Sequence, residues 1–368
     1  MPDKINNDER FMRRAMSLAR KGMGVTSPNP MVGAVIVSDG QIIAEGWHKA
    51  AGRMHAEAEA LAKVGGSAVG ATMYVNLEPC IHFGKTAPCA PAIVKAGIRR
   101  VVIGCIDPNP KVSGKGIAYL KDHGVETVTG VLQDEAMDLN RAFFKHITTG
   151  TPWVTLKMAM TVDGRIADRW MDSKYISNKE SLQWVHKQRT ISDAVMVGIG
   201  TIISDNPLLT PRNVKIVKYP VRVVPDNNLQ IHNDNILIKT AHDSPVWIYH
   251  GRSNPDKEHE LEEVGCKIIK VESRNGLLDL KSVLKDMGRR GIQTVMVEGG
   301  ARLAASLVRE GLWDELAIFV APKIAGDDRA ISIFTGLEEG VSIGSFKEMK
   351  LHKVSRFGDD VLLIYRRK

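Results

Sequence analysis

The 368-residue sequence has few cysteines, few aromatic residues and no long hydrophobic run. Its four cysteines are too few for a disulfide framework, so a close pair is expected to bind a metal or to act in catalysis. No stretch approaches the roughly 18 apolar residues of a membrane span. The amino-terminal segment is charged and lacks the apolar core of a signal peptide. We therefore expect a cytoplasmic protein that does not enter a membrane.

The charge pattern gives little support to nucleic-acid binding. The formal net charge is +8, but the basic residues are scattered among acidic ones and form no polybasic tract. Aromatic residues make up only 5% of the chain, which leaves few side chains for stacking on bases. A small phosphorylated ligand could use the same positive excess. We expect a small-molecule partner and no nucleic acid.

The length favours two domains, and an interruption of the periodic pattern near residues 146–153 places the boundary between 1–148 and 152–368. The first domain alternates helix-like and strand-like segments. A helix is expected at 9–21, behind a cap at Asn7 or Asp8, and Asp39-Gly40 predicts a β-hairpin. The other elements expected are strands at 32–37, 41–47, 71–77 and 101–104 and helices at 55–64, 89–96 and 133–147.

The second domain carries short β-rich runs separated by helical segments. This pattern predicts an open α/β sheet covered by helices on both faces. The expected strands are 153–160, 194–198, 221–224, 246–250, 294–300 and 315–324.

The residues that carry the clearest chemistry are His55, Glu57, Cys80 and Cys89. His55 and Glu57 open a predicted helix, and residues two apart in a helix can share a site only at its first turn. Cys89 lies at the start of the next predicted helix, where the positive end of the helix dipole favours a thiolate. One imidazole and two thiolates leave the fourth position of a tetrahedral zinc open to water. The sequence therefore predicts one catalytic Zn²⁺ per chain.

Zinc lowers the pKa of bound water to roughly 7 and supplies hydroxide at neutral pH. A carboxylate that is not a ligand, here Glu57, can move the proton to a departing amine. His-x-Glu followed by Pro-Cys-x-x-Cys is the zinc deaminase signature. Eight residues rather than two separate Cys80 from Cys89, and this longer loop carries His82 and Lys85, which could bind an anionic substrate. Taken singly, Lys85 fits a solvated surface residue better than a substrate contact.

Seven short motifs of the first half occur in a characteristic order: Pro28-Asn29-Pro30, Val32-Gly33, Gly46-Trp47-His48, His55-Ala56-Glu57, Glu78-Pro79-Cys80, Gly84-Lys85-Thr86 and Asp107-Pro108-Asn109-Pro110. In these the chain resembles the bacterial riboflavin biosynthesis family RibD, with Ile81 and Phe83 as departures. The resemblance implies a cytidine-deaminase-like three-layer α/β/α domain followed by a dihydrofolate-reductase-like α/β domain. It also implies that the pyrimidine and ribose phosphate are contacted by Asn29, His48, His82, Lys85, Asp107 and Asn109.

The second half resembles the reductase domain of the same family in Asp163-Gly164-Arg165, Asn206-Pro207 and Val297-Glu298-Gly299-Gly300. Paired glycines before a helix near Ala301 suit a pyrophosphate, although a plain tight turn is the alternative. The chain has no G-x-G-x-x-G after the first strand, which argues against a Rossmann domain. The resemblance assigns NADPH contacts to Ala159, Tyr175, Ser177, Thr201, Asp205, Gly300, Ala301, Arg302, Leu303, Ala304, Ala305 and Ser306. It assigns substrate contacts to Ser173, Arg189, Leu209, Arg212 and Glu298.

The resemblance implies a bifunctional enzyme. It would deaminate 2,5-diamino-6-ribosylamino-4(3H)-pyrimidinone 5′-phosphate by zinc-hydroxide chemistry, then reduce the ribosyl group with NADPH to give 5-amino-6-ribitylaminouracil 5′-phosphate. Asp205 is predicted to assist the reduction, unless it only caps its turn. The family also suggests a homo-oligomer. The competing hypotheses are a tRNA or nucleoside deaminase with an accessory domain and a binding protein with a structural zinc, for which no fourth ligand is evident.

Overall fold

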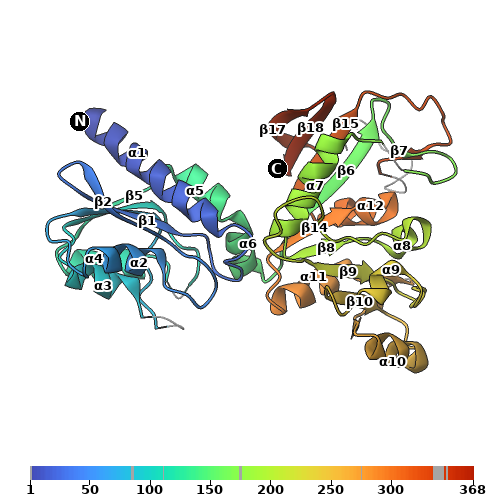
Figure 1. Ribbon diagram of the computed structural model, residues 1–368, viewed down its shortest axis with the longest axis horizontal. Helices are drawn as coiled ribbons and strands as arrows, with labels where there is room; N and C mark the ends of the chain where they lie inside the picture. The colour runs from blue at the N-terminus through green and yellow to red at the C-terminus, as the bar shows by residue number, and fades with distance from the viewer. Residues whose placement is uncertain are drawn as a thin grey trace. The chain divides into compact units, whose positions relative to one another are not determined.

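The computed structural model describes residues 2–83, 87–110, 112–173, 176–274, 276–334, 344 and 347–368. Two of the predicted contact residues, Lys85 and Tyr175, lie outside this set. The chain divides into two compact units, Met1–Gly150 and Thr151–Lys368 (Figure 1). Within the described residues, no helix has both the length and the apolar character needed to cross a membrane.

The first unit is built on a five-stranded sheet of order β2-β1-β3-β4-β5. The hairpin β1–β2 pairs antiparallel with β3, and β3, β4 and β5 run parallel. Asp39 and Gly40, both with positive φ, make the predicted turn of this hairpin. The strands are β1 (Gly33–Ser38), β2 (Gln41–Trp47), β3 (Thr72–Leu77), β4 (Arg100–Cys105) and β5 (Glu126–Thr129).

Helices cover both faces of this sheet and complete the predicted three-layer α/β/α arrangement. One apolar cluster joins the sheet to α2, α3 and α4, and a second joins the opposite face to α1 and α5. The elements are α1 (Pro2–Ala19), the 3₁₀ turn η1 (Arg20–Gly22), α2 (Ala56–Lys63), α3 (Cys89–Lys95), α4 (Lys115–Asp122), α5 (Gln133–Leu139) and α6 (Arg141–Thr149).

The predicted start of the first helix is wrong, because α1 already begins at Pro2 and Asp8 lies inside it. Asp8 is buried and binds side chains of the sheet instead of capping a helix. Its carboxylate accepts a bidentate pair from Arg100 at 2.8 Å and a hydrogen bond from the Tyr74 hydroxyl at 2.9 Å. An aspartate before an apolar helical pattern predicts a helix cap, but here the carboxylate binds an arginine that is distant in the sequence.

The single helix expected at 133–147 is also wrong, because the structure has α5 and α6 separated at Asn140. Asn140 is 2% exposed, and its side chain forms both hydrogen bonds of an amide with the backbone of Met31. These bonds fix the loop that precedes β1. The break therefore follows from a tertiary contact that helical periodicity does not reveal.

Gly46 allows β2 to pack directly against the start of α2. A Cβ at this position would lie 2.2 Å from the carbonyl oxygen of Ala56 and 2.6 Å from the amide nitrogen of Ala60. We expect Gly46→Ala to lower the free energy of unfolding of the first unit by about 3 kcal/mol, as overpacking does. Urea denaturation followed by circular dichroism measures this change.

The matched control is Gly200→Ala, since a Cβ there would meet nothing within 4 Å. That variant should unfold at the wild-type urea concentration or slightly above it. An unchanged midpoint for Gly46→Ala would show that β2 and α2 are not in tight contact.

The second unit contains a nine-stranded sheet of order β11-β10-β9-β8-β14-β6-β15-β18-β17. Pairing is parallel from β11 to β15 and antiparallel across β15, β18 and β17. The carboxyl-terminal hairpin β17–β18 was not predicted. The strands are β6 (Trp153–Thr161), β8 (Ala194–Met196), β9 (Val221–Pro225), β10 (Val246–His250), β11 (Lys267–Lys270), β14 (Thr294–Glu298), β15 (Glu315–Ala321), β17 (Met349–Phe357) and β18 (Asp360–Arg367).

Helices lie on both faces of this sheet as well, and two short pairs, β7–β16 and β12–β13, stand apart from it. One apolar cluster contains α11 and α12, and the other contains α7, α8, α9 and α10. The helices are α7 (Lys179–Ile191), α8 (Ile199–Asp205), α9 (Ile236–Lys239), α10 (Pro255–Glu263), α11 (Leu280–Arg289) and α12 (Ala301–Arg309). The short strands are β7 (Arg165–Ala167), β12 (Ser273–Arg274), β13 (Leu277–Leu278) and β16 (Ile331–Ser332).

Candidate zinc and reductase sites

The three predicted metal ligands come together between two helix starts and the end of a strand. His55 is the residue that precedes α2, and Cys89 is the first residue of α3. Cys80 follows β3, and its carbonyl oxygen accepts the amide N–H of Ala90 at 3.0 Å. This backbone bond closes the loop between the cysteines, so the eight intervening residues do not separate the two sulfur atoms.

The distances fit a tetrahedral zinc ion. Nδ1 of His55 lies 3.5 Å from Sγ of Cys80 and 3.3 Å from Sγ of Cys89. Ligand atoms about 2.3 Å (sulfur) and 2.0 Å (nitrogen) from a tetrahedral zinc are roughly 3.6 Å apart. Within the described part of the chain, these are the only three His, Cys, Asp or Glu residues grouped closely enough to hold a metal. Contacts of the Cys80 sulfur with Cys89 and His55 lower its pKa to about 4, which favours the thiolate.

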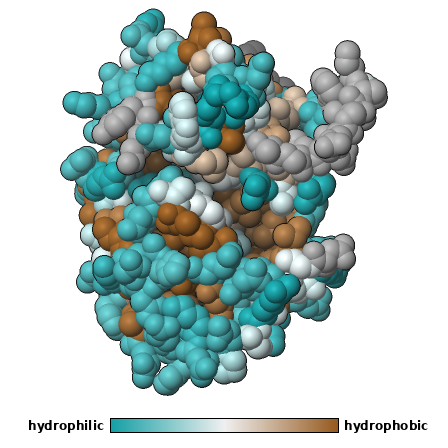
Figure 2. All heavy atoms as spheres, turned by 90° about the vertical axis from the view of Figure 1, so that its right-hand side faces the viewer, coloured by the Kyte–Doolittle hydropathy of each residue, from teal (hydrophilic) through white to brown (hydrophobic). Residues whose placement is uncertain are grey.

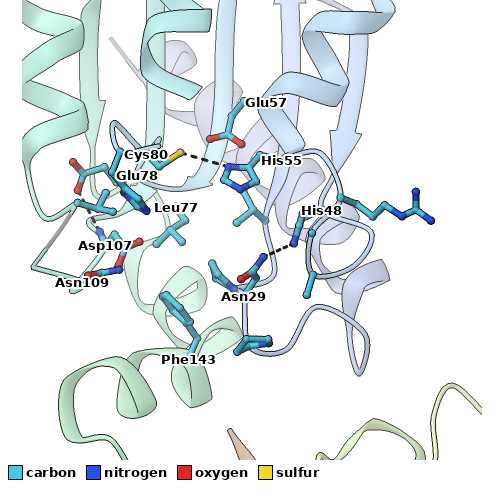
Figure 3. A pocket seen from close by; sticks show the side chains of 18 residues that line it. Asn29, His48, His55, Glu57, Leu77, Glu78, Cys80, Asp107, Asn109 and Phe143 are labelled. Carbon is cyan, nitrogen blue, oxygen red and sulfur yellow. Dashed lines mark hydrogen bonds between the residues drawn. The ribbon is translucent and has the colours of Figure 1, made fainter. Parts of the chain in front are cut away.

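Glu57 points into the same place from the first turn of α2 (Figure 3). The side chain is only 3% exposed. Burial and the neighbouring Cys80 raise its pKa to about 7, and a cation at the ligand cluster would act in the opposite direction. Glu57 is therefore a buried carboxyl beside the ligands, in the place that a proton carrier needs.

A cavity of about 310 Å³ opens beside the ligands. In Figure 3, Asn29 and His48 lie on one side of it, Asp107 and Asn109 lie on the other, and Phe143 lies at the end away from Glu57. Five of the six predicted substrate residues of this unit line the cavity: Asn29, His48, His82, Asp107 and Asn109. Lining residues that carried no predicted role include Arg53, Glu78, Val112 and Phe143. Of the two departures from the family motif, Phe83 is 82% exposed and Ile81 is partly buried.

The tautomer of His48 follows from its two partners. Its Nδ1 lies 3.0 Å from the carbonyl oxygen of Met54, so Nδ1 carries the proton and donates it. Nε2 is then an acceptor, and the Asn29 amide donates to it at 3.0 Å. This pairing leaves the Asn29 oxygen available toward the cavity. Burial lowers the pKa of His48, which keeps its imidazole neutral.

The loop that carries Asn29 is held by two buried amides that the motifs did not indicate. Asn76, in β3, accepts the N–H of Gly33 at 2.8 Å and donates to the carbonyl of Met31 at 3.0 Å. Asn140, which lies 109 residues after Met31 in the chain, also binds its backbone. The only signal in the sequence is a polar residue at a position that periodicity assigns to the core.

In the second unit the predicted substrate residues Arg189 and Glu298 form a buried bidentate ion pair. Arg189 donates to the two carboxylate oxygens at 2.7 and 2.8 Å and to the carbonyl of Thr210 at 3.1 Å. Lys157 sits beside Glu298 in the adjacent strand. Burial raises the pKa of Glu298, but Arg189 and Lys157 more than offset this, so the pKa lies below its usual value. The lowered pKa favours the ionised carboxylate, which Arg189 binds directly.

The glycine turn predicted before Ala301 is present. Gly299 and Gly300 have positive φ and connect β14 to α12, which begins at Ala301. A Cβ on Gly300 would lie 3.2 Å from Oγ1 of Thr201, so the starts of α8 and α12 are neighbours. The first-turn N–H groups of α12 are available to an anion. Further on, Ala304 and Ala305 are buried, and the N–H of Ala304 is bonded to Gly300 within the helix.

The remaining predicted contacts of this unit come from β6, from α8 and α12 and from the loops that join other elements. Asp205 ends α8, is exposed and accepts from Ser204 at 2.6 Å. Leu209 is buried with a positive φ. The others are exposed (Ser173, Arg212, Arg302) or partly buried (Ala159, Ser177, Leu303, Ser306). On the face that Figure 2 shows, hydrophobic side chains gather across the middle, between polar groups.

Comparison with known proteins covers both units. Residues 5–105 match the cytidine and deoxycytidylate deaminase zinc-binding region, and residues 152–363 match the RibD C-terminal domain. The riboflavin biosynthesis protein RibD of Aquifex aeolicus is 40% identical, with 98% of each chain covered. That of Escherichia coli is 35% identical over 97% of this chain and 98% of the other.

Two solved structures extend the similarity to the whole fold. Acinetobacter baumannii RibD has a TM-score of 0.88 at 36% identity, covering 99% of this chain and 100% of the other. A diaminohydroxyphosphoribosylaminopyrimidine deaminase/5-amino-6-(5-phosphoribosylamino)uracil reductase of Thermotoga maritima has a TM-score of 0.87 at 36% identity, with 99% and 100% coverage.

The fold and the ligand cluster define a class of enzyme in which a zinc-dependent deaminase domain is followed by a reductase domain. The name of the Thermotoga maritima relative gives both activities to one chain, and that chain aligns with this one from end to end. The chain belongs to the RibD family, the bifunctional deaminase and reductase of riboflavin biosynthesis.

Proposed function

We propose that the first unit deaminates 2,5-diamino-6-ribosylamino-4(3H)-pyrimidinone 5′-phosphate and that the second reduces the ribosyl group of the product. The observation that carries the proposal is the cluster of His55, Cys80 and Cys89 with Glu57 beside it and a cavity in front of it. The family and the name of the Thermotoga maritima relative support the same substrate. The five polar residues in the cavity wall suit a pyrimidine that carries a ribose phosphate.

His55, Cys80 and Cys89 would hold the zinc. A zinc ion bound by three protein ligands lowers the pKa of water and so supplies a nucleophile at neutral pH. Glu57 takes the proton from the attacking water and delivers it to the amino group, which leaves as ammonia when the C–N bond breaks. Asn29 and His48 orient the pyrimidine from one wall, and Asp107 and Asn109 orient it from the other.

In the second unit, NADPH would bind at the glycine turn and at the start of α12, with Thr201 beside it. Bound NADPH would supply the hydride for reduction at C1′, and Asp205 would assist the accompanying proton transfer. Arg212 and the Arg189–Glu298 pair contact the ribose phosphate. Lys85 and Tyr175 keep their predicted roles as contacts of substrate and cofactor. We further propose that the two activities reside in residues 1–148 and 152–368 of a cytoplasmic homo-oligomer.

The two half-reactions can be tested on one sample. The full chain, given the diaminopyrimidinone phosphate and NADPH, should release one ammonia and oxidise one NADPH, with each product identified by mass. Treatment with a chelator such as 1,10-phenanthroline should abolish ammonia release by removing zinc. NADPH oxidation should continue when the deaminated intermediate is supplied, because none of the predicted zinc ligands lies in the second unit.

Chelator-resistant ammonia release would overturn the zinc assignment. Absence of NADPH oxidation with the deaminated intermediate would overturn the reductase assignment. Deamination of RNA rather than of the phosphorylated pyrimidine would favour the nucleic-acid deaminase hypothesis.

A further inference from the structure

Glu78 is a buried carboxylate at the end of β3 that belongs neither to the metal ligands nor to the proton carrier. Only 4% of the residue is exposed. Its two oxygens accept four backbone N–H groups: those of Asp107 at 3.3 Å, Gly114 at 2.9 Å, Gly116 at 3.0 Å and Ile117 at 3.3 Å. One side chain therefore satisfies four donors that lie 29 to 39 residues further along the chain.

These donors all belong to the segment that leaves β4 and enters α4. Three of them are at the start of α4, where N–H groups have no partner within the helix and the helix dipole favours an anion. The residue that precedes α4 is Gly114, which has no side chain to cap it. Glu78 supplies this cap from another part of the sheet, through charge-assisted hydrogen bonds.

The approach of α4 to the end of β3 is unusually close. A Cβ on Gly116 would lie 2.0 Å from the carbonyl oxygen of Pro79 and 3.3 Å from Oε1 of Glu78. Only glycine permits this contact. The carboxylate and the helix start are thus held against each other by packing as well as by hydrogen bonds.

The same segment carries one wall of the cavity. Asp107 and Asn109 both line it, and the Asn109 N–H donates to Oδ1 of Asp107 at 2.8 Å. Figure 3 shows Glu78 on the side of the cavity where these two residues lie. Glu78 binds the N–H of Asp107 at one end of the segment and the start of α4 at the other. These bonds fix the position of the segment that forms this wall of the cavity.

We propose that Glu78 is a positioning residue for the deaminase substrate, acting through Asp107 and Asn109. The inference rests on the proposed function, because it takes these two residues as substrate contacts. The carboxylate fixes the wall of the cavity and takes no part in moving protons. Its loss should weaken substrate binding more than it slows the chemical step.

The test is Glu78→Gln in the full chain, which keeps the shape but turns an amide NH₂ toward backbone donors. We expect KM for the diaminopyrimidinone phosphate to rise about tenfold, as loss of one charge-assisted bond implies, while kcat changes far less. The zinc content, and the rate of NADPH oxidation with the deaminated intermediate, should match those of the wild type. Amide hydrogen exchange in the peptide 105–122, followed by mass spectrometry without substrate, should be faster.

Gly116→Ala perturbs the same contact from the other side and should give the same pattern, which keeps the proposal testable if Glu78→Gln does not fold. Asp8→Asn is the matched control: it alters a buried carboxylate of the same unit that does not line the cavity, and it should leave KM unchanged. An unchanged KM in both test variants, an equal rise in Asp8→Asn, or loss of zinc with a collapse of kcat would overturn the inference. Failure of the proposed function would instead appear in the wild type, as no ammonia release.

Discussion

Glu57→Gln should abolish deamination while leaving zinc bound. Glutamine has the same shape but cannot take a proton from water and pass it on, so ammonia release should fall about a thousandfold, the middle of the range for general acid–base catalysis. Because Glu57 is not among the three ligands, the metal content measured by atomic absorption should stay at one per chain. NADPH oxidation with the deaminated intermediate should be unaffected.

Glu59→Gln is the control for this experiment. Glu59 is also buried, lies in the same helix and is paired with Lys49 at 2.9 Å, but it does not line the cavity. This variant should keep deaminase activity close to the wild-type rate. Full ammonia release from Glu57→Gln would mean that another group carries the proton.

Glu298→Gln should strongly destabilise the second unit. The change leaves the Arg189 guanidinium without the carboxylate that binds it and removes the negative charge beside Lys157. Removing one partner of a buried ion pair costs about 3 to 5 kcal/mol. Thermal unfolding monitored by circular dichroism should show a lower midpoint, and reductase activity should be lost while ammonia release continues.

A second substitution tests the cause. Adding Arg189→Met to Glu298→Gln removes the cation that the first change leaves without its partner, so the double variant should be more stable than Glu298→Gln alone. The pKa of Glu298 is lowered in the folded chain, so its contribution to stability is present above the pKa of the unfolded carboxyl and is lost as the pH falls. A double variant less stable than the single one would contradict the ion-pair explanation.

The elements that form the metal site could be predicted from the sequence because their signals are local. The hairpin turn at Asp39 and Gly40 and the helix starts at Ala56 and Cys89 depend on neighbouring residues, and the structure has them where expected. The convergence of His55, Cys80 and Cys89 was expected from the zinc deaminase signature rather than from the positions of the helices, and the structure groups these residues. Resemblance to a family then supplied the residues that spacing alone could not.

The parts that were missed depend on partners far away in the sequence. The sequence predicts a helix cap at Asp8, but the carboxylate binds Arg100 instead. It also predicts a helical residue at Asn140, whose side chain instead binds the backbone of Met31 and interrupts the helix. Glu78 stood inside a recognised motif, yet its four donors lie beyond residue 106 and nothing near it indicates them. A polar residue at a buried position must have a hydrogen-bond partner, but the sequence does not indicate which residue that partner is.

The two sheets differ in when they can be completed during synthesis. Every strand of the five-stranded sheet, and every predicted zinc ligand, is made before residue 130. The nine-stranded sheet instead needs β18, which ends at Arg367 and pairs with β15 and β17. Since domains fold as units in the order of synthesis, the deaminase unit can fold and bind its metal on a nascent chain, whereas the sheet of the reductase unit closes only after β18 has been made.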